Sequence, residues 1–185
     1  KIAEGEVLQL INKNNPASTE HSYMQVIQNK TAILFEAAAH CGAILAGADT
    51  AAQDALKSYG MHIGIAFQLI DDALDYDGDA ASLGKNVGDD LAEGKPTLPL
   101  IHAMTQCSDD DAQLIRECLK SQAPLTADTL QRVITIVSAT GSLDYTRSKA
   151  QEQAGKALAC LDALQPSPYR EALQTLSAFS VARST

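Results

Sequence analysis

Hydrophobic residues recur about every three to four positions along most of the chain, which is the spacing of amphipathic helices. Short segments rich in Gly, Pro, Asn or Ser separate these periodic stretches. The pattern predicts helices over residues 2–11, 22–45, 50–76, 98–104, 110–121, 127–140, 143–164 and 169–182. Residues 77–96, in which glycines alternate with acids, are predicted to form a loop with a short helical piece. With no internal repeat or linker, we expect a single all-α domain over residues 1–185.

Composition agrees with this fold class and excludes several functions. Hydrophobic residues make up 45% of the chain, aromatic residues only 4%, and Trp is absent, which favours helices over sheets. The net charge of -9 argues against nucleic-acid binding and against attraction to an anionic membrane. No apolar run approaches the roughly 20 residues of a membrane span, and no signal peptide is present. The chain begins at Lys1 within a helical pattern, which suggests a cut or incomplete boundary.

The cysteines point to the compartment. The four are Cys41, Cys107, Cys118 and Cys160. They form no Cys-x-x-Cys pair and the histidines are far apart, which argues against zinc. Reduced, buried thiols in a cytoplasmic protein are therefore expected.

Three carboxylates at the end of a long apolar helix are the most informative feature. At about 3.6 residues per turn, Asp71 and Asp75 share one helix face and Asp72 lies beside them. Anions this close repel one another unless a cation joins them, and the helix dipole disfavours them at this end. Carboxylate oxygens suit Mg²⁺, which often shares its ligands with substrate phosphates. The alternative is a solvated helix end with ordinary surface acids.

Two glycines lie near the acidic side of the same helix. Gly64 falls in the same stripe as the carboxylates, and Gly60 lies just outside it. Because glycine has no side chain, we expect another body to approach the helix backbone there.

Lysines accompany the acids. Lys30-Thr31 lies inside the predicted helix 22–45, and Lys85 and Lys95 lie in the glycine-containing segment that follows Asp75. Flexible glycines with lysines can close over an anion and exclude water, which together with the acids indicates a diphosphate site. Taken alone, Lys30 fits a lysine with its stem along the helix and its amine in water. The later segment, taken alone, equally fits a charged surface loop.

A second acidic cluster is assigned differently. Asp109-Asp110-Asp111 precedes the apolar run that begins at Leu114. Acids at a helix N-terminus cap the backbone and favour the helix dipole. We therefore interpret this cluster as capping rather than as a metal site.

Several short motifs together resemble a known family, the trans-isoprenyl diphosphate synthases. In order, they are Ala3-Glu4-Gly5-Glu6, Lys30-Thr31, Phe67-Gln68, Asp71-Asp72-x-x-Asp75 and Gly84-Lys85-x-x-Gly88-Asp89-Asp90. Each motif is weak alone, but the ordered set covers essentially the whole chain and is highly specific. It resembles the C-terminal part of the family, and residues 4–10 are most similar to the bacterial long-chain branch, the octaprenyl synthases.

The resemblance implies a fold, a reaction and partners. The fold is the all-helical bundle of this family, C-terminal part only. The reaction is the Mg²⁺-dependent condensation of an allylic diphosphate with isopentenyl diphosphate. Its product is a long trans-polyprenyl diphosphate, of octaprenyl length for a quinone side chain. A cytoplasmic homodimer is also implied.

The resemblance also assigns roles to individual residues. Asp71 is the expected direct ligand of Mg²⁺, and the other two acids act directly or through water. The metal-binding residues are thus Asp71, Asp72 and Asp75. The residues that bind the allylic substrate are Lys30, Gln68, Lys85 and Lys95. The residues assigned to catalysis are Lys30, Thr31, Gln68 and Asp71, with Thr31 and Gln68 lining the carbon where positive charge develops.

One departure from the family is large. The family's first aspartate-rich motif and its basic residues for isopentenyl diphosphate lie upstream of the matched part, and nothing in this sequence replaces them. We therefore expect the 185 residues to be inactive in chain elongation on their own. Two other interpretations are a non-catalytic subunit of a prenyl synthase and a class I terpene cyclase. Non-catalytic subunits often lose their aspartates, whereas this chain keeps three, which weighs against that interpretation. A terpene cyclase disagrees with Lys30-Thr31 and with the lysines after Asp75.

Overall fold

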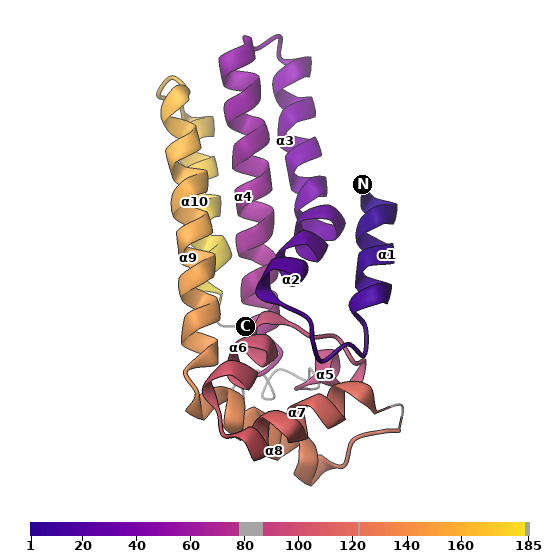
Figure 1. Ribbon diagram of the computed structural model, residues 1–185. Helices are drawn as coiled ribbons and strands as arrows, with labels where there is room; N and C mark the ends of the chain where they lie inside the picture. The colour runs from indigo at the N-terminus through magenta and orange to yellow at the C-terminus, as the bar shows by residue number, and fades with distance from the viewer. Residues whose placement is uncertain (78–86, 122, 184–185) are drawn as a thin grey trace.

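All regular structure is helical in residues 1–77, 87–121 and 123–183, the part of the chain that the computed structural model describes. The α-helices are α1 (Ile2–Asn12), α2 (Glu20–Ile27), α3 (Ile33–Leu45), α4 (Thr50–Leu74), α5 (Asp89–Ala92), α6 (Leu98–Gln106), α7 (Asp109–Lys120), α8 (Ala127–Ala139), α9 (Ser142–Cys160) and α10 (Pro168–Ala182). In Figure 1, α3, α4, α9 and α10 stand side by side, and α7 and α8 cross their lower end. The prediction of an all-α fold is confirmed.

The helix predicted over residues 22–45 is continuous but irregular. Between α2 and α3 it contains a π-helical turn, η1 (Gln28–Ala32), which carries Lys30 and Thr31. A π turn widens the helix locally and often marks a functional site. The sequence pattern gave no indication of this turn. A second short irregularity, the 3₁₀ turn η3 (Leu161–Ala163), ends the helix predicted over 143–164.

Side chains cap the helix starts. Thr19 and Ser22 form a reciprocal capping box at α2, and the Asp49 carboxylate accepts a hydrogen bond from the Ala52 N–H at α4. At α7 the cap is Ser108, and the acids of residues 109–111 lie in the first turn. The expected place of these acids at a helix N-terminus is confirmed, although the capping side chain is a serine.

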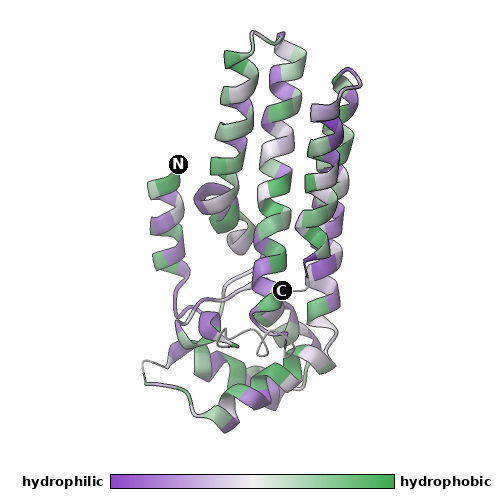
Figure 2. Ribbon diagram, turned by 180° about the vertical axis from the view of Figure 1, so that it is seen from behind, coloured by the Kyte–Doolittle hydropathy of each residue, from purple (hydrophilic) through white to green (hydrophobic). Residues whose placement is uncertain are grey.

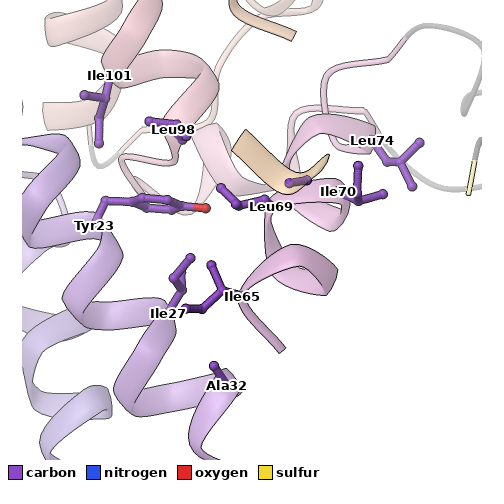
Figure 3. Packing of buried hydrophobic residues seen from close by; sticks show 10 residues of the cluster. Tyr23, Ile27, Ala32, Ile65, Leu69, Ile70, Leu74, Leu98 and Ile101 are labelled. Atoms are coloured by element: carbon purple, nitrogen blue, oxygen red, sulfur yellow. The ribbon is translucent and has the colours of Figure 1, made fainter. Parts of the chain in front are cut away.

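The central helix is α4, which packs against α3, α9, α10 and η1. Its C-terminal half is buried on several sides, with Ile65, Leu69 and Ile70 each no more than 2% exposed. These side chains meet Tyr23 and Ile27 of α2 in one cluster, shown in Figure 3. This packing brings α2 against the end of α4 that carries the aspartates. By contrast, α3, whose many hydrophobic residues are green in Figure 2, leaves some of them exposed, among them Leu34 at 54%.

The two glycines of α4 do allow a close approach, and the approaching body is the neighbouring helix. A Cβ atom at Gly64 would lie 2.6 Å from the Cα atom of Ala32, and one at Gly60 would overlap the backbone of Phe35. Likewise, a Cβ atom at Gly5 of α1 would lie 2.6 Å from the backbone nitrogen of Lys30. Missing side chains thus let the segment from Lys30 to Phe35 lie directly against α4 and α1.

The structure also bears on the expectations about membrane-spanning helices and about the cysteine thiols. No helix in the described ranges is long and apolar enough to cross a membrane. The expected burial of the thiols holds for Cys118, is wrong for Cys41, which is exposed, and holds only in part for Cys107 and Cys160, which are half-buried. Cys41 lies on α3, away from the buried side of that helix.

We predict that Gly64→Ala destabilises the fold by about 2 kcal/mol or more, because the new methyl group overlaps backbone that cannot move aside. Gly155→Ala in α9 is the matched control, since a Cβ atom at Gly155 would have no atom of a neighbouring element within 4 Å. This control should be neutral or stabilising by about 0.5–1 kcal/mol. Urea unfolding measures both changes, and equal effects of the two substitutions would contradict the close packing.

Candidate active site

A cavity of about 180 Å³ lies where α1, α2 and η1 face the C-terminal part of α4. Five of the residues predicted from the sequence line it together. They are Lys30, Thr31, Gln68, Asp72 and Lys95. Lys30 and Thr31 come from the π turn, Gln68 and Asp72 from α4, and Lys95 from the segment before α6. Lys85 lies outside the described residues.

A chain of hydrogen bonds runs along the wall of this cavity. Thr31 Oγ1 donates to Gln68 Oε1 at 3.0 Å, and Gln68 Nε2 donates to Asp72 Oδ1 at 2.7 Å. The second carboxylate oxygen of Asp72, Oδ2, accepts from the Tyr23 hydroxyl at 2.6 Å. The sequence assignment of Thr31 and Gln68 to one place is therefore matched by direct contact between them.

Asp72 is a buried acid, with 3% of its surface exposed. Burial, and then the nearby charge of Asp90, raise its pKa to about 7, while the hydrogen bonds from Tyr23 and Gln68 act in the opposite direction. Its two neutral donors cannot cancel a negative charge. When this carboxylate is ionised, the described side chains compensate its charge only in part.

Asp75 has a different environment. Its Oδ2 accepts the backbone N–H of Asp90 at 3.1 Å, at the start of α5. Burial and the charge of Asp90 raise the pKa of Asp75 to about 7, and burial also raises the pKa of Asp90. Asp75 therefore joins the end of α4 to α5 as well as adding negative charge near the cavity.

Asp71 is much more accessible than Asp72, with its side chain 43% exposed. Its nearest basic partner is Arg183, whose Nη1 lies 3.6 Å from Asp71 Oδ1. Arg183 is itself held over the Phe67 ring at 4.0 Å and donates to the Phe67 carbonyl oxygen at 3.1 Å. This residue at the end of α10 thus reaches the acidic end of α4.

The three aspartates do not by themselves make a complete metal site. Among the described residues, no group of three or more His, Cys, Asp or Glu side chains is arranged to hold a metal ion. The donor chemistry nevertheless fits Mg²⁺, because oxygen ligands with unbalanced negative charge are what this ion requires. In such a site the remaining ligands come from water or phosphate oxygens.

The two described lysines lie at the cavity but already have acidic or polar partners. Lys30 Nζ donates to Gln9 Oε1 at 2.5 Å and lies 3.3 Å from Glu6 Oε1, both on α1. Lys95 Nζ lies 3.1 Å from Asp90 Oδ1 and 2.8 Å from Glu93 Oε2. Partial burial of Lys95 lowers its pKa, but hydrogen bonds and charges from these two acids outweigh this effect and raise it overall.

Sequence reasoning missed two residues of this site, Tyr23 and Arg183, and gave Asp90 no role. Tyr23 precedes Lys30 by seven residues, about two helical turns, so the helical period could have placed both on one face. Arg183 follows the last predicted helix, and nothing in the local sequence indicates its reach to Asp71.

A family model and several curated proteins are similar to this chain in sequence. The family model described as "Polyprenyl synthetase" matches residues 1–137. The octaprenyl diphosphate synthase of Escherichia coli is 52% identical over 98% of this chain, and the nonaprenyl diphosphate synthase of Rhodobacter capsulatus is 47% identical over 99%. The chain spans about half the length of these relatives, 56% and 55% respectively.

Solved structures give the same result for the fold. A polyprenyl synthase from Caulobacter crescentus, complexed with calcium and isoprenyl diphosphate, has a TM-score of 0.92 and 42% identity. The match covers 100% of this chain and 56% of that one. A decaprenyl diphosphate synthase from Rhodobacter capsulatus has a TM-score of 0.91 and 38% identity. The expected helical bundle of the isoprenyl diphosphate synthases is thereby confirmed.

We predict that Asp72 makes the metal-free fold less stable as the pH rises. The pKa of Asp72 is about 7 in the folded state, against roughly 3.9 in an unfolded chain. Between these values the folded state binds more protons, so the stabilisation is complete below about pH 4 and is lost as the pH rises through 7. Relative to Asp72→Asn, the free energy of unfolding should fall by on the order of 2 kcal/mol from pH 5 to 7.5.

Urea titrations in EDTA measure this difference. Asp54→Asn, at an exposed position of the same helix, is the control and should follow the wild-type profile. Parallel profiles of wild type and Asp72→Asn would show that the buried carboxylate carries no such penalty.

Proposed function

Since the chain belongs to the polyprenyl synthetase family, we propose that it forms the allylic-diphosphate and metal side of a trans-polyprenyl diphosphate synthase. The observation that carries this proposal is the cavity whose lining includes the hydrogen-bonded residues Thr31, Gln68 and Asp72 together with Lys30 and Lys95. Oriented oxygen atoms and two ammonium groups that can bind an anion thus line the same cavity. Such an arrangement suits a substrate that separates into a carbocation and a diphosphate.

The proposed work of the cations is to hold the diphosphate. Lys30 and Lys95 present Nζ atoms at the cavity, and Lys85 is proposed as a third lysine from the resemblance. Mg²⁺, when bound, would stabilise the negative charge that grows on the departing diphosphate. Asp71 is proposed as its direct ligand because this carboxylate is half-exposed. Asp72 and Asp75, whose oxygens accept protein hydrogen bonds, are proposed to act through water.

The proposed work of Thr31 and Gln68 is to stabilise the allylic cation. Thr31 gives its hydroxyl hydrogen to Gln68 Oε1, so the lone pairs of Thr31 Oγ1 stay available. Gln68 in turn gives hydrogen to Asp72, which leaves its own oxygen directed away from that acid. Preorganised oxygen dipoles of this kind stabilise positive charge without reorganisation.

The finer assignments are also proposals. The second substrate is isopentenyl diphosphate, as implied by the family, and the product length is octaprenyl, as in the Escherichia coli relative. The calcium in the Caulobacter crescentus structure supports a divalent ion, for which we propose Mg²⁺. A homodimer, a cytoplasmic location and use in a quinone side chain are proposed from the family resemblance alone. Neither a non-catalytic subunit nor a terpene cyclase is favoured by any contact in the site.

We predict that the 185-residue chain alone incorporates no isopentenyl diphosphate, whereas a chimera does so with Mg²⁺. The chimera joins the N-terminal remainder of the Escherichia coli relative to Lys1 and thereby supplies the expected upstream motif. Radiolabelled incorporation into extractable prenyl product measures both proteins. Product from the chain alone would contradict its expected dependence on an upstream half.

In this chimera, Asp71→Ala should lower turnover by at least about 100-fold, because a direct metal ligand is lost. Asp54→Ala removes an exposed carboxylate from the same helix and should change turnover little. Equal rates for Asp71→Ala and wild type would rule out the metal role.

A further inference from the structure

Tyr23 belongs both to the hydrophobic cluster around Leu69 and to the hydrogen-bond chain along the cavity wall. Of the two described hydrogen-bond partners of Asp72, only Tyr23 is part of that cluster. Its ring packs with Ile27 and Leu98, and Figure 3 shows it extending from α2 toward Leu69. The side chain is 5% exposed, and its hydroxyl donates to Asp72 Oδ2 at 2.6 Å. Phenylalanine would satisfy the packing, so the hydroxyl needs another explanation.

The hydroxyl determines how Asp72 presents its oxygens. With Oδ2 held by Tyr23, the carboxylate cannot turn about its terminal bond, and Oδ1 stays directed at Gln68. A carboxylate oxygen without a proton only accepts hydrogen bonds, and Oδ1 accepts from the NH₂ group of Gln68 at 2.7 Å. The carbonyl oxygen of Gln68 must then point the other way, toward Thr31. The orientation of this amide follows from that hydrogen-bond order.

We propose that Tyr23 is a positioning residue, whose hydroxyl acts through Asp72 to keep the Gln68 carbonyl oxygen facing Thr31 and the cavity. This inference rests on the proposed function, because it assigns that oxygen to the carbon where positive charge develops. It also separates the aspartates by task. Asp72 orients the amide, and direct metal binding is left to Asp71.

The order of the contacts explains why the donor must come from another helix. Gln68 and Asp72 lie one turn apart on α4, so their hydrogen bond alone leaves both free to turn together. Tyr23 lies on α2, 49 residues away in sequence, and Thr31 lies on the π turn that continues α2. The pair on α4 is therefore held from both ends by the same continuous helical segment. Removing the Tyr23 hydroxyl releases one end while leaving the other.

The test uses Tyr23→Phe in the chimera described above, which keeps the ring and removes only the hydroxyl. Tyr59→Phe is the matched control, because Tyr59 is 2% exposed and its hydroxyl donates to the Leu173 carbonyl oxygen at 2.9 Å. Both variants lose the hydroxyl of a buried tyrosine in the same fold, and Tyr59→Phe also removes the acceptor of the Ser177 hydroxyl at 3.4 Å. Only Tyr23→Phe loses the hydroxyl at the cavity.

We expect Tyr23→Phe to lower kcat by about 10- to 100-fold, with KM for the allylic diphosphate within about twofold of wild type. Tyr59→Phe should leave both constants within about twofold. A purely structural role of Tyr23 would instead give both variants the same kinetics at temperatures below unfolding. Such a result would overturn the proposal.

A second measurement needs neither metal nor turnover. In ¹⁵N-labelled protein, the Gln68 side-chain NH₂ resonances, assigned with Gln68→Glu, should shift and exchange faster with solvent in Tyr23→Phe. They should be unchanged in Tyr59→Phe, and an unchanged Gln68 signal in Tyr23→Phe would overturn the proposal. An inactive wild-type chimera would contradict the proposed function, whereas the amide spectra would still decide whether Tyr23 positions Gln68.

Discussion

The site depends on one buried negative charge, that of Asp72. Burying a carboxylate costs several kcal/mol unless hydrogen bonds or an opposite charge compensate for it. Here Tyr23 and Gln68 supply two short hydrogen bonds, and the neighbouring acid Asp90 adds repulsion rather than relief. The fold must therefore bring α2 against the acidic end of α4 to make even this partial compensation possible. A divalent cation would supply the compensation that the described side chains lack.

The close packing of the segment from Lys30 to Phe35 against α4 and α1 depends on glycines, which have no side chain. Gly60 and Gly64 leave room on α4 for the backbone of the segment from Ala32 to Phe35, and Gly5 leaves room on α1. The segment that occupies this space contains the π turn Gln28–Ala32. Because a π turn has more residues than an α-helical turn, the side chains before and after it point in different directions from those of a regular helix. Thr31 thus reaches Gln68 while Tyr23, two turns before Lys30, reaches Asp72. Small residues and an irregular turn together produce the hydrogen-bond chain.

Much of this could be predicted from the sequence, because helical periodicity and glycine are local signals. The helices were found at nearly the expected residues, and Lys30, Thr31, Gln68 and Asp72, which the sequence assigned to one site, line one cavity, whereas Asp71 and Asp75 are not among its lining residues. The π turn could not be predicted, since its residues Gln28–Ala32 have an ordinary helical composition. Arg183 was missed because its contact with Asp71 spans more than a hundred residues and depends on how α10 packs. Tyr23 was missed for a different reason, as its apolar ring fits the core pattern and hides the purpose of its hydroxyl.

The balance of charge around the cavity decides in what form an anion can enter. Lys30 is already paired with Glu6, and Lys95 with Asp90 and Glu93. A bare diphosphate would have to compete with these carboxylates and also approach Asp71, Asp72 and Asp75, so repulsion would oppose it. With the proposed metal bound, the cation would compensate the aspartates, and the lysines would be free to pair with phosphate oxygens. Burial, and then the charge of Asp90, raise the pKa values of Asp72 and Asp75. Under the proposed function, the charge balance at the acidic end of α4 thus favours a metal–diphosphate complex over either component alone.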